Sequence, residues 1–145
     1  MNLWLAIGTV AVFGAVEFWL AVPAGFAFGL HPLVTCIATI SGGVIGVLVV
    51  TIPGERIGAW MARRRAGKPR SKSWDRAGRI WEKYGIIGLA FISPVVPGAP
   101  LGALIALALG APKWRVLLWF PASIVVWSVG VTLVGVIGLA ALHAG

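Results

Sequence analysis

Charged residues are scarce in this chain of 145 residues: 12 are Lys or Arg, and four are Asp or Glu. A soluble domain carries about 25% charged residues, whereas the share here is 11%. A domain this small leaves much of its surface against solvent, and so few charges could not cover that surface in water. Hydrophobic residues make up 59% of the chain, which excludes a disordered protein. The sequence therefore predicts an integral membrane protein.

Cysteine is nearly absent as well, and the single residue, Cys36, excludes a secreted domain held together by disulfides. No group of His, Cys, Asp and Glu has the spacing of metal ligands, and no glycine-rich phosphate loop is present. The apolar segments offer no Ser-His-Asp or Cys-His set, because their only acid is Glu17. We therefore expect a protein that is not an enzyme and that uses no cofactor.

Most of the charges lie in one segment, residues 55–83, which holds ten basic and three acidic residues. Short loops rich in Lys and Arg remain in the cytoplasm, so we place this segment there. It has no nucleic-acid-binding fold, and the partner expected of its charges is the membrane lipid. Trp74, Ala77 and Trp81 recur at helical spacing, which predicts a short helix over residues 73–83 lying in the membrane interface.

Two apolar segments, residues 33–53 and 116–142, are long enough for a spanning helix, which needs about 20 apolar residues. We predict ordinary transmembrane helices at both places. A third apolar segment, residues 3–30, is interrupted by Glu17 and by a Val-Pro-Ala-Gly stretch that contains Pro23. This segment is predicted to be a broken helix.

The fourth apolar segment, residues 85–111, contains Pro94, Pro97, Gly98 and Pro100. Each proline lacks a backbone donor and leaves a carbonyl unpaired one turn earlier. Such carbonyls are tolerated at membrane depth only when they are buried in protein or line a wet cavity. We therefore predict a re-entrant hairpin that enters and leaves the membrane on the cytoplasmic side.

The two halves of the chain resemble each other weakly. At an offset of 81 positions, residues 49–52 align with 130–133 and Gly29 aligns with Gly110. The Val-Pro pair at 22–23 matches the pair at 96–97 only after a gap of seven residues. A broken helix followed by a full helix, occurring twice, is the arrangement of many transporters. The prediction is one all-α membrane domain over residues 1–145, an inverted repeat of two broken or re-entrant hairpins, each followed by a transmembrane helix: a first repeat (1–54), the basic cytoplasmic loop (55–83) and a second repeat (84–145).

Glu17 is the strongest functional signal, because a carboxylate within an apolar run costs several kcal/mol unless it is solvated or paired. It can line a substrate or ion pathway and couple transport to protons, or it can hydrogen-bond backbone amides freed near Gly25. We expect Pro23 and Pro97 to shape the two hairpin tips. The residues predicted to line the pathway are Glu17, Trp19, Pro23, Ser93, Pro94, Pro97 and Gly98.

Several segments of the chain resemble sequence signatures of known membrane-protein families. Residues 17–23 read Glu-Phe-Trp-Leu-Ala-Val-Pro, which resembles the Glu-Leu-Arg-Gly-Ala-Ile-Pro signature of the small multidrug export proteins. Residues 83–85, 94–99 and 102–106 are similar to the second signature of that family, Lys-Tyr-Gly, Pro-Leu-Pro-Gly-Thr-Gly and Gly-Ala-Leu-Ile-Ala. The family is similar in turn to the DedA, or VTT-domain, membrane proteins, whose Phe-x-Arg-x-x-Pro-Gly motif resembles residues 91–98.

This resemblance implies two re-entrant hairpins that face each other and a role in moving small cationic or lipid-like molecules across the bilayer. It also implies a location in the inner membrane of a bacterial cell. The chain departs from the motifs where arginines are expected, since Trp19, Ser93 and Pro100 stand in their places. Glu17 therefore lacks the internal arginine partner of the motif.

We expect a small-molecule or multidrug exporter whose central site is lined by Glu17. Two alternatives stay open. A lipid scramblase or lipid-carrier flippase would use the same cavity without an ion gradient. A structural or holin-like pore-forming protein would assemble into large oligomers and would not need Glu17. A homo-oligomer is expected in each case, because four short segments enclose little volume.

Overall fold

The computed structural model describes residues 2–69, 72–96 and 98–144, with the side chains of Phe18, Met61, Ser73 and Trp74 left aside. Within this part of the chain there are seven α-helices and no strand. The prediction of an all-helical protein is confirmed. The helices are α1 (Leu3–Val16), α2 (Phe18–Ala27), α3 (Pro32–Thr51), α4 (Gly54–Arg65), α5 (Lys72–Ile92), α6 (Ala99–Ala108) and α7 (Lys113–Ala144).

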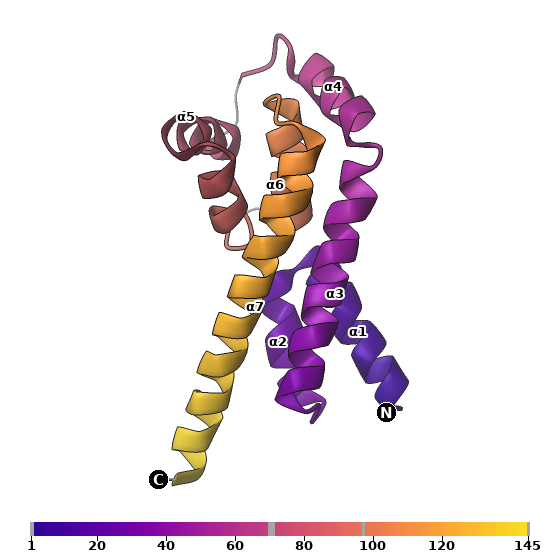
Figure 1. Cartoon of the computed structure of the whole chain (residues 1–145), viewed down its shortest axis with the longest axis vertical. Helices are drawn as coiled ribbons and strands as arrows, with labels where there is room; N and C mark the ends of the chain where they lie inside the picture. Colours follow the sequence, from indigo (N-terminus) through magenta and orange to yellow (C-terminus); the bar gives the residue numbers. More distant parts are fainter. Residues whose placement is uncertain (1, 70–71, 97, 145) are drawn as a thin grey trace.

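Two helices are long and apolar enough to cross a membrane: α3 with 20 residues and α7 with 32. They match the helices predicted at 33–53 and 116–142. Figure 1 shows them running in opposite directions through the molecule. Their axes come close near the middle of α3, where a Cβ on Gly43 would lie 3.0 Å from the Ile124 side chain of α7. The two long helices thus form the frame on which the short ones pack.

The short helices cover this frame from its two ends (Figure 1). At one end α1 runs toward the middle of the molecule and α2 returns. At the other end the second half of α5 runs toward the middle and α6 returns. The α1–α3 contact depends on small residues, because a Cβ on Gly14 or Gly42 would collide with the backbone of the facing helix.

The returning helices α2 and α6 are built alike. Both have ten residues, and they start 81 positions apart, at Phe18 and Ala99. A glycine with positive φ follows each helix: Gly29 with 69° and Gly110 with 93°. Such a φ costs glycine little, which is why this cap uses it. In both caps a backbone hydrogen bond then joins residues five positions apart. Leu30 N–H donates to Gly25 O at 3.0 Å, and Ala111 N–H donates to Ala106 O at 2.9 Å.

Helix α5 is interrupted at Gly85, whose φ of 64° and ψ of −155° lie outside the helical region. The part before Gly85 confirms the helix predicted over 73–83. Its apolar face lies against the protein, since Ala77 is buried and both Ile80 and Trp81 pack on the core. The part after Gly85 leads to the proline-rich turn.

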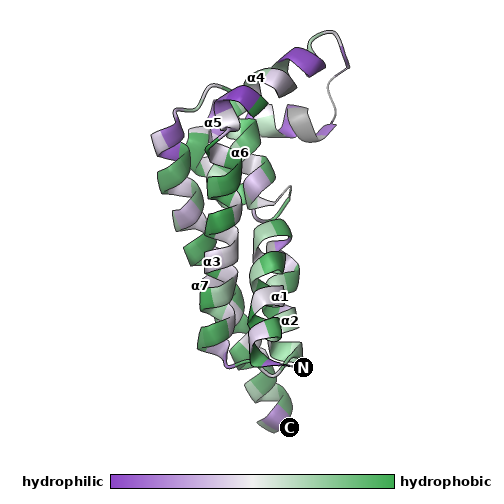
Figure 2. Ribbon diagram, turned by 90° about the vertical axis from the view of Figure 1, so that its right-hand side faces the viewer, coloured by the Kyte–Doolittle hydropathy of each residue, from purple (hydrophilic) through white to green (hydrophobic). Residues whose placement is uncertain are grey.

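Hydrophilic residues gather at one end of the molecule, on α4 and the first half of α5 (Figure 2). Helix α4 is not predicted from the sequence. It begins with Glu55 in its first turn and ends with three arginines in its last, a pattern that complements the helix dipole. Lys113 Nζ lies 3.3 Å from Glu55 Oε1. The start of α7 is therefore at the same end of the molecule as the basic segment.

Candidate functional site

The two pairs of short helices meet tip to tip between the long helices. The first tip is Glu17, whose extended backbone (φ −138°, ψ 95°) separates α1 from α2. The second tip is the turn from Ser93 to Gly98, and Gly98 has a φ of 86°. A Cβ on Gly98 would lie 3.5 Å from the carbonyl oxygen of Val16. The backbones of the two tips are thus nearly in contact.

A cavity of about 280 Å³ lies between these tips. It is referred to below as the tip junction. Among the residues that line it, Glu17 carries the one charged side chain, and the others are apolar or aromatic. The first tip contributes Val16, Glu17 and Trp19, and the second contributes Pro94, Val95, Val96, Gly98 and Leu101.

The backbone of Glu17 is hydrogen-bonded, but its carboxylate is not. Its N–H donates to the carbonyl of Phe13 at 2.6 Å, and its carbonyl accepts from the N–H of Leu20 at 3.1 Å. The side chain is exposed and does not cap α2. Among the described residues, none pairs with the carboxylate. The alternative that Glu17 bonds amides near Gly25 is wrong, because Gly25 lies inside α2 and packs against Thr35.

Two helices begin at the tip junction. Helix α2 starts directly after Glu17, and α6 starts directly after Gly98. The first N–H groups of a helix have no partner inside the helix and carry partial positive charge. Glu17 and Gly98 are also 81 positions apart, the offset that separates the starts of α2 and α6. The junction therefore combines one acid with two positively polarised helix ends.

The second tip is anchored to α7 by two hydrogen bonds that the sequence analysis did not predict. Pro94 has no N–H, so the carbonyl of Ala90 lacks its helical donor. The Ser123 hydroxyl donates to this carbonyl at 2.7 Å. One residue further on, Trp127 Nε1 donates to the carbonyl of Phe91 at 2.8 Å. The sequence contains a signal for the Ser123 bond: a serine lies in the apolar run of α7, and Pro94 leaves a carbonyl unpaired.

Trp127 also reaches the first tip. Its ring centroid lies 6.2 Å from that of Trp19, and the two ring planes are tilted by 56°. Tilted aromatic pairs at this separation are favourable. One side chain of α7 thus contacts both tips, through its ring on one side and its N–H on the other.

Four of the seven predicted pathway residues line the junction: Glu17, Trp19, Pro94 and Gly98. Ser93 lies behind it and is buried. Its hydroxyl donates to the carbonyl of Leu89, and its side chain packs against Gly102 of α6. Pro97 lies outside the described residues.

The prediction that Pro23 shapes a tip is wrong, because Pro23 lies inside α2. A proline removes one N–H and crowds the carbonyl four residues earlier. Here that residue is Trp19, in the first turn of α2, and the helix continues past the proline. The match of residues 22–23 with 96–97 includes Pro97, which lies outside the described residues.

The fold and the site define an all-helical protein with two candidate membrane-crossing helices and a largely apolar cavity between two helix tips. The model of the family described as "Putative small multi-drug export protein" matches residues 17–129. This match covers more than half of the chain, from the first tip into α7, and the chain belongs to that family. The family and the apolar helices indicate a membrane protein of a transport class. No curated protein and no solved structure matches the chain.

Proposed function

We propose that this protein is a small-molecule exporter, related to the DedA, or VTT-domain, proteins and built as an inverted repeat of two re-entrant hairpins. The equal lengths and matching C-terminal caps of α2 and α6 support the repeat, and their opposite directions support its inversion (Figure 1). Ten helical residues span about 15 Å, half of a hydrocarbon core of roughly 30 Å. The tip junction would then lie near the midplane, where transporters with inverted repeats bind their substrates.

The orientation we infer places the basic end in the cytoplasm of a bacterial cell, with the protein in its inner membrane. The ion pair between Glu55 and Lys113 supports this, because it places the end of the segment 85–111 at the basic end. The segment also starts there, directly after the first half of α5. Lys and Arg in short loops favour the cytoplasmic side. The second hairpin would enter and leave from that side, and the first from the opposite side.

The substrate we infer is small, cationic and partly apolar. The observation that carries this inference is the Glu17 carboxylate, which has no partner among the described residues and stands in an otherwise apolar cavity. Charge attraction is strong where water is scarce. The Trp19 ring, 45% exposed beside Glu17, can add a cation–π contact. The cavity of about 280 Å³ is at the lower end of ligand pockets, which favours a small molecule.

Coupling to protons would use the same carboxylate. Glu17 can hold a proton or face a bound cation, and the two states compete for one group. Exchange of a cation from the cytoplasm for a proton from the other side would then drive export. This part of the proposal predicts that a proton gradient accelerates transport.

The test is the flux of a fluorescent aromatic cation in vesicles that contain the purified protein. Glu17→Gln keeps the shape of the side chain but removes its charge, and we expect at least a tenfold lower flux, the size of one charge-assisted hydrogen bond. Glu82→Gln is the matched control, because Glu82 is an exposed acid on α5 that does not line the junction. An equal flux in the Glu17→Gln variant and the unmodified protein would overturn the proposal.

The same vesicles separate the two other functions. A scramblase or lipid-carrier flippase would exchange labelled lipids between leaflets without an ion gradient. A holin-like pore would release large solutes and would be indifferent to Glu17→Gln. Either result, with no cation flux, would replace the exporter by that function.

A further inference from the structure

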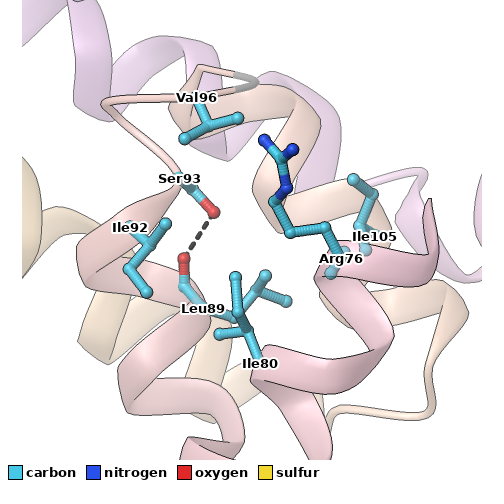
Figure 3. Close-up of a pocket in the computed structure, with 8 residues that line it drawn as sticks. Arg76, Ile80, Leu89, Ile92, Ser93, Val96 and Ile105 are labelled. Atoms are coloured by element: carbon cyan, nitrogen blue, oxygen red, sulfur yellow. Dashed lines mark hydrogen bonds between the residues drawn. The ribbon is translucent and has the colours of Figure 1, made fainter. Parts of the chain in front are cut away.

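A second cavity lies on the other side of the second tip (Figure 3). Its volume is about 90 Å³, and it is lined by both halves of α5, the turn after α5, and α6. Val96 lines this cavity and the tip junction alike, so a single turn of chain separates the two. The second cavity is referred to below as the Arg76 pocket, and its lining includes Arg76, Ile80, Leu89, Ile92, Val96 and Ile105.

The interior of the Arg76 pocket offers a ligand almost no polar group. Most of its lining side chains are aliphatic. The one hydroxyl, on Ser93, donates to the carbonyl of Leu89 four residues earlier (Figure 3). A ligand that enters must therefore present an apolar part to the pocket.

Arg76 supplies the one charge of the pocket lining. Figure 3 shows its side chain rising along the pocket, with the guanidinium group toward the end where Val96 lies. No ion pair joins Arg76 to an acid among the described residues. A guanidinium group binds phosphate oxygens through its fork of N–H donors. An arginine beside an aliphatic cavity fits a ligand that has an anionic phosphate and an alkyl chain.

The volume of the pocket indicates whether an alkyl chain or an aromatic ring of a ligand fits inside it. An apolar cavity of about 150 Å³ admits benzene, and this pocket is smaller, at about 90 Å³. It accommodates part of one alkyl chain better than an aromatic ring. The chemistry differs from that of the tip junction, where an acid and tryptophan favour a cation.

We propose that the Arg76 pocket binds an anionic phospholipid of the leaflet at the charged end, with its phosphate on Arg76 and one acyl chain in the cavity. The proposal rests on the membrane placement given above. The surrounding charges agree with it, because the first half of α5 lies at the hydrophilic end of the molecule (Figure 2). A chain in the pocket would contact Val96 and so the turn that forms one wall of the tip junction.

The test is photo-crosslinking of the full-length protein in phosphatidylcholine nanodiscs. The probe is phosphatidylglycerol with a diazirine on one acyl chain close to its ester, and phosphatidylcholine with the same chain is the comparison. We expect the anionic probe to form adducts on Ile80, Ile92 or Ile105. Arg76→Gln should lower their yield about tenfold, the loss expected for a charge-assisted hydrogen bond. Arg79→Gln, which removes an exposed charge outside the pocket, should leave the yield unchanged.

Two further variants keep the proposal open to refutation. Ile80→Phe fills the pocket but keeps Arg76, and it should abolish the adducts while the variant unfolds at the usual temperature. Glu17→Gln should leave the adducts intact, so failure of the exporter proposal and failure of this one are distinguishable. Equal labelling by phosphatidylcholine, equal loss in Arg79→Gln, or competition by inorganic phosphate as strong as by phosphatidylglycerol would each overturn the lipid site.

Discussion

Ser123 donates its hydroxyl at 2.7 Å to the carbonyl of Ala90, which Pro94 leaves without a helical donor. Ser123 is fully buried, so this contact lies inside the protein. A carbonyl freed by proline at membrane depth needs such a partner, because lipid offers none. The break in the segment 85–111 is thus stabilised by a residue of α7 that lies 33 positions from Ala90 in the sequence.

The first prediction concerns this hydrogen bond. Ser123→Ala removes the donor and leaves the Ala90 carbonyl buried without a partner, which costs about 1–3 kcal/mol. We expect a lower unfolding temperature in detergent. Ser41→Ala is the control, because Ser41 is an exposed serine on α3. Equal unfolding temperatures of the two variants would show that the bond contributes nothing.

The second prediction couples Ser123 to Pro94. Pro94→Ala restores an N–H that can donate to the Ala90 carbonyl. In this background, Ser123→Ala should cost less, because the carbonyl keeps a donor. A double-mutant cycle should give a coupling of at least about 0.5 kcal/mol. Additive effects of the two substitutions would contradict the assignment of the freed carbonyl to Ser123.

A third prediction compares two glycines that lie inside long helices. A Cβ on Gly42 would collide with the backbone of α1 at Ala11, whereas nothing lies within 4 Å of a Cβ on Gly130. Gly42→Ala should therefore lower stability by about 1–3 kcal/mol, as overpacking does. Gly130→Ala should raise it by up to about 1 kcal/mol through helix propensity. The measurement is thermal unfolding of both variants, and a change of the same sign in both would refute this packing.

The fourth prediction concerns the side of the membrane on which α4 and the start of α7 lie. In a Cys36→Ser background, single cysteines at Glu55 and Lys113 should react with a membrane-impermeant thiol reagent from the same side of the membrane. A cysteine at His31 should react only from the other side. Labelling of positions 55 and 113 from opposite sides would mean that the segment 85–111 crosses the membrane.

Several features could be predicted from the sequence because they follow from composition along the chain. The lengths of the apolar runs predict α3 and α7, since a spanning helix must match the hydrocarbon thickness. Helical spacing predicts the first half of α5 and the face that it buries. Pro94 and Gly98 mark the second tip because proline lacks a donor and Gly98 has a positive φ.

The first tip could not be placed in the same way. The chain turns at Glu17 with no glycine, no proline and no side-chain cap, while Pro23 stays inside a helix. Packing decides this position, because α1 lies close against α3 through Gly14 and Gly42. Where the helix must stop therefore depends on a distant helix rather than on the residues nearby.

The sequence by itself determined the helical class, the two long apolar helices and the charged end, because each depends on the local content of apolar and charged residues. The tertiary structure alone decided that Glu17 and Gly98 line one cavity, that Ser123 and Trp127 anchor the second tip, and that Arg76 borders a separate pocket. These pairings join residues far apart along the chain. They depend on how the helices pack, which no local pattern of residues specifies.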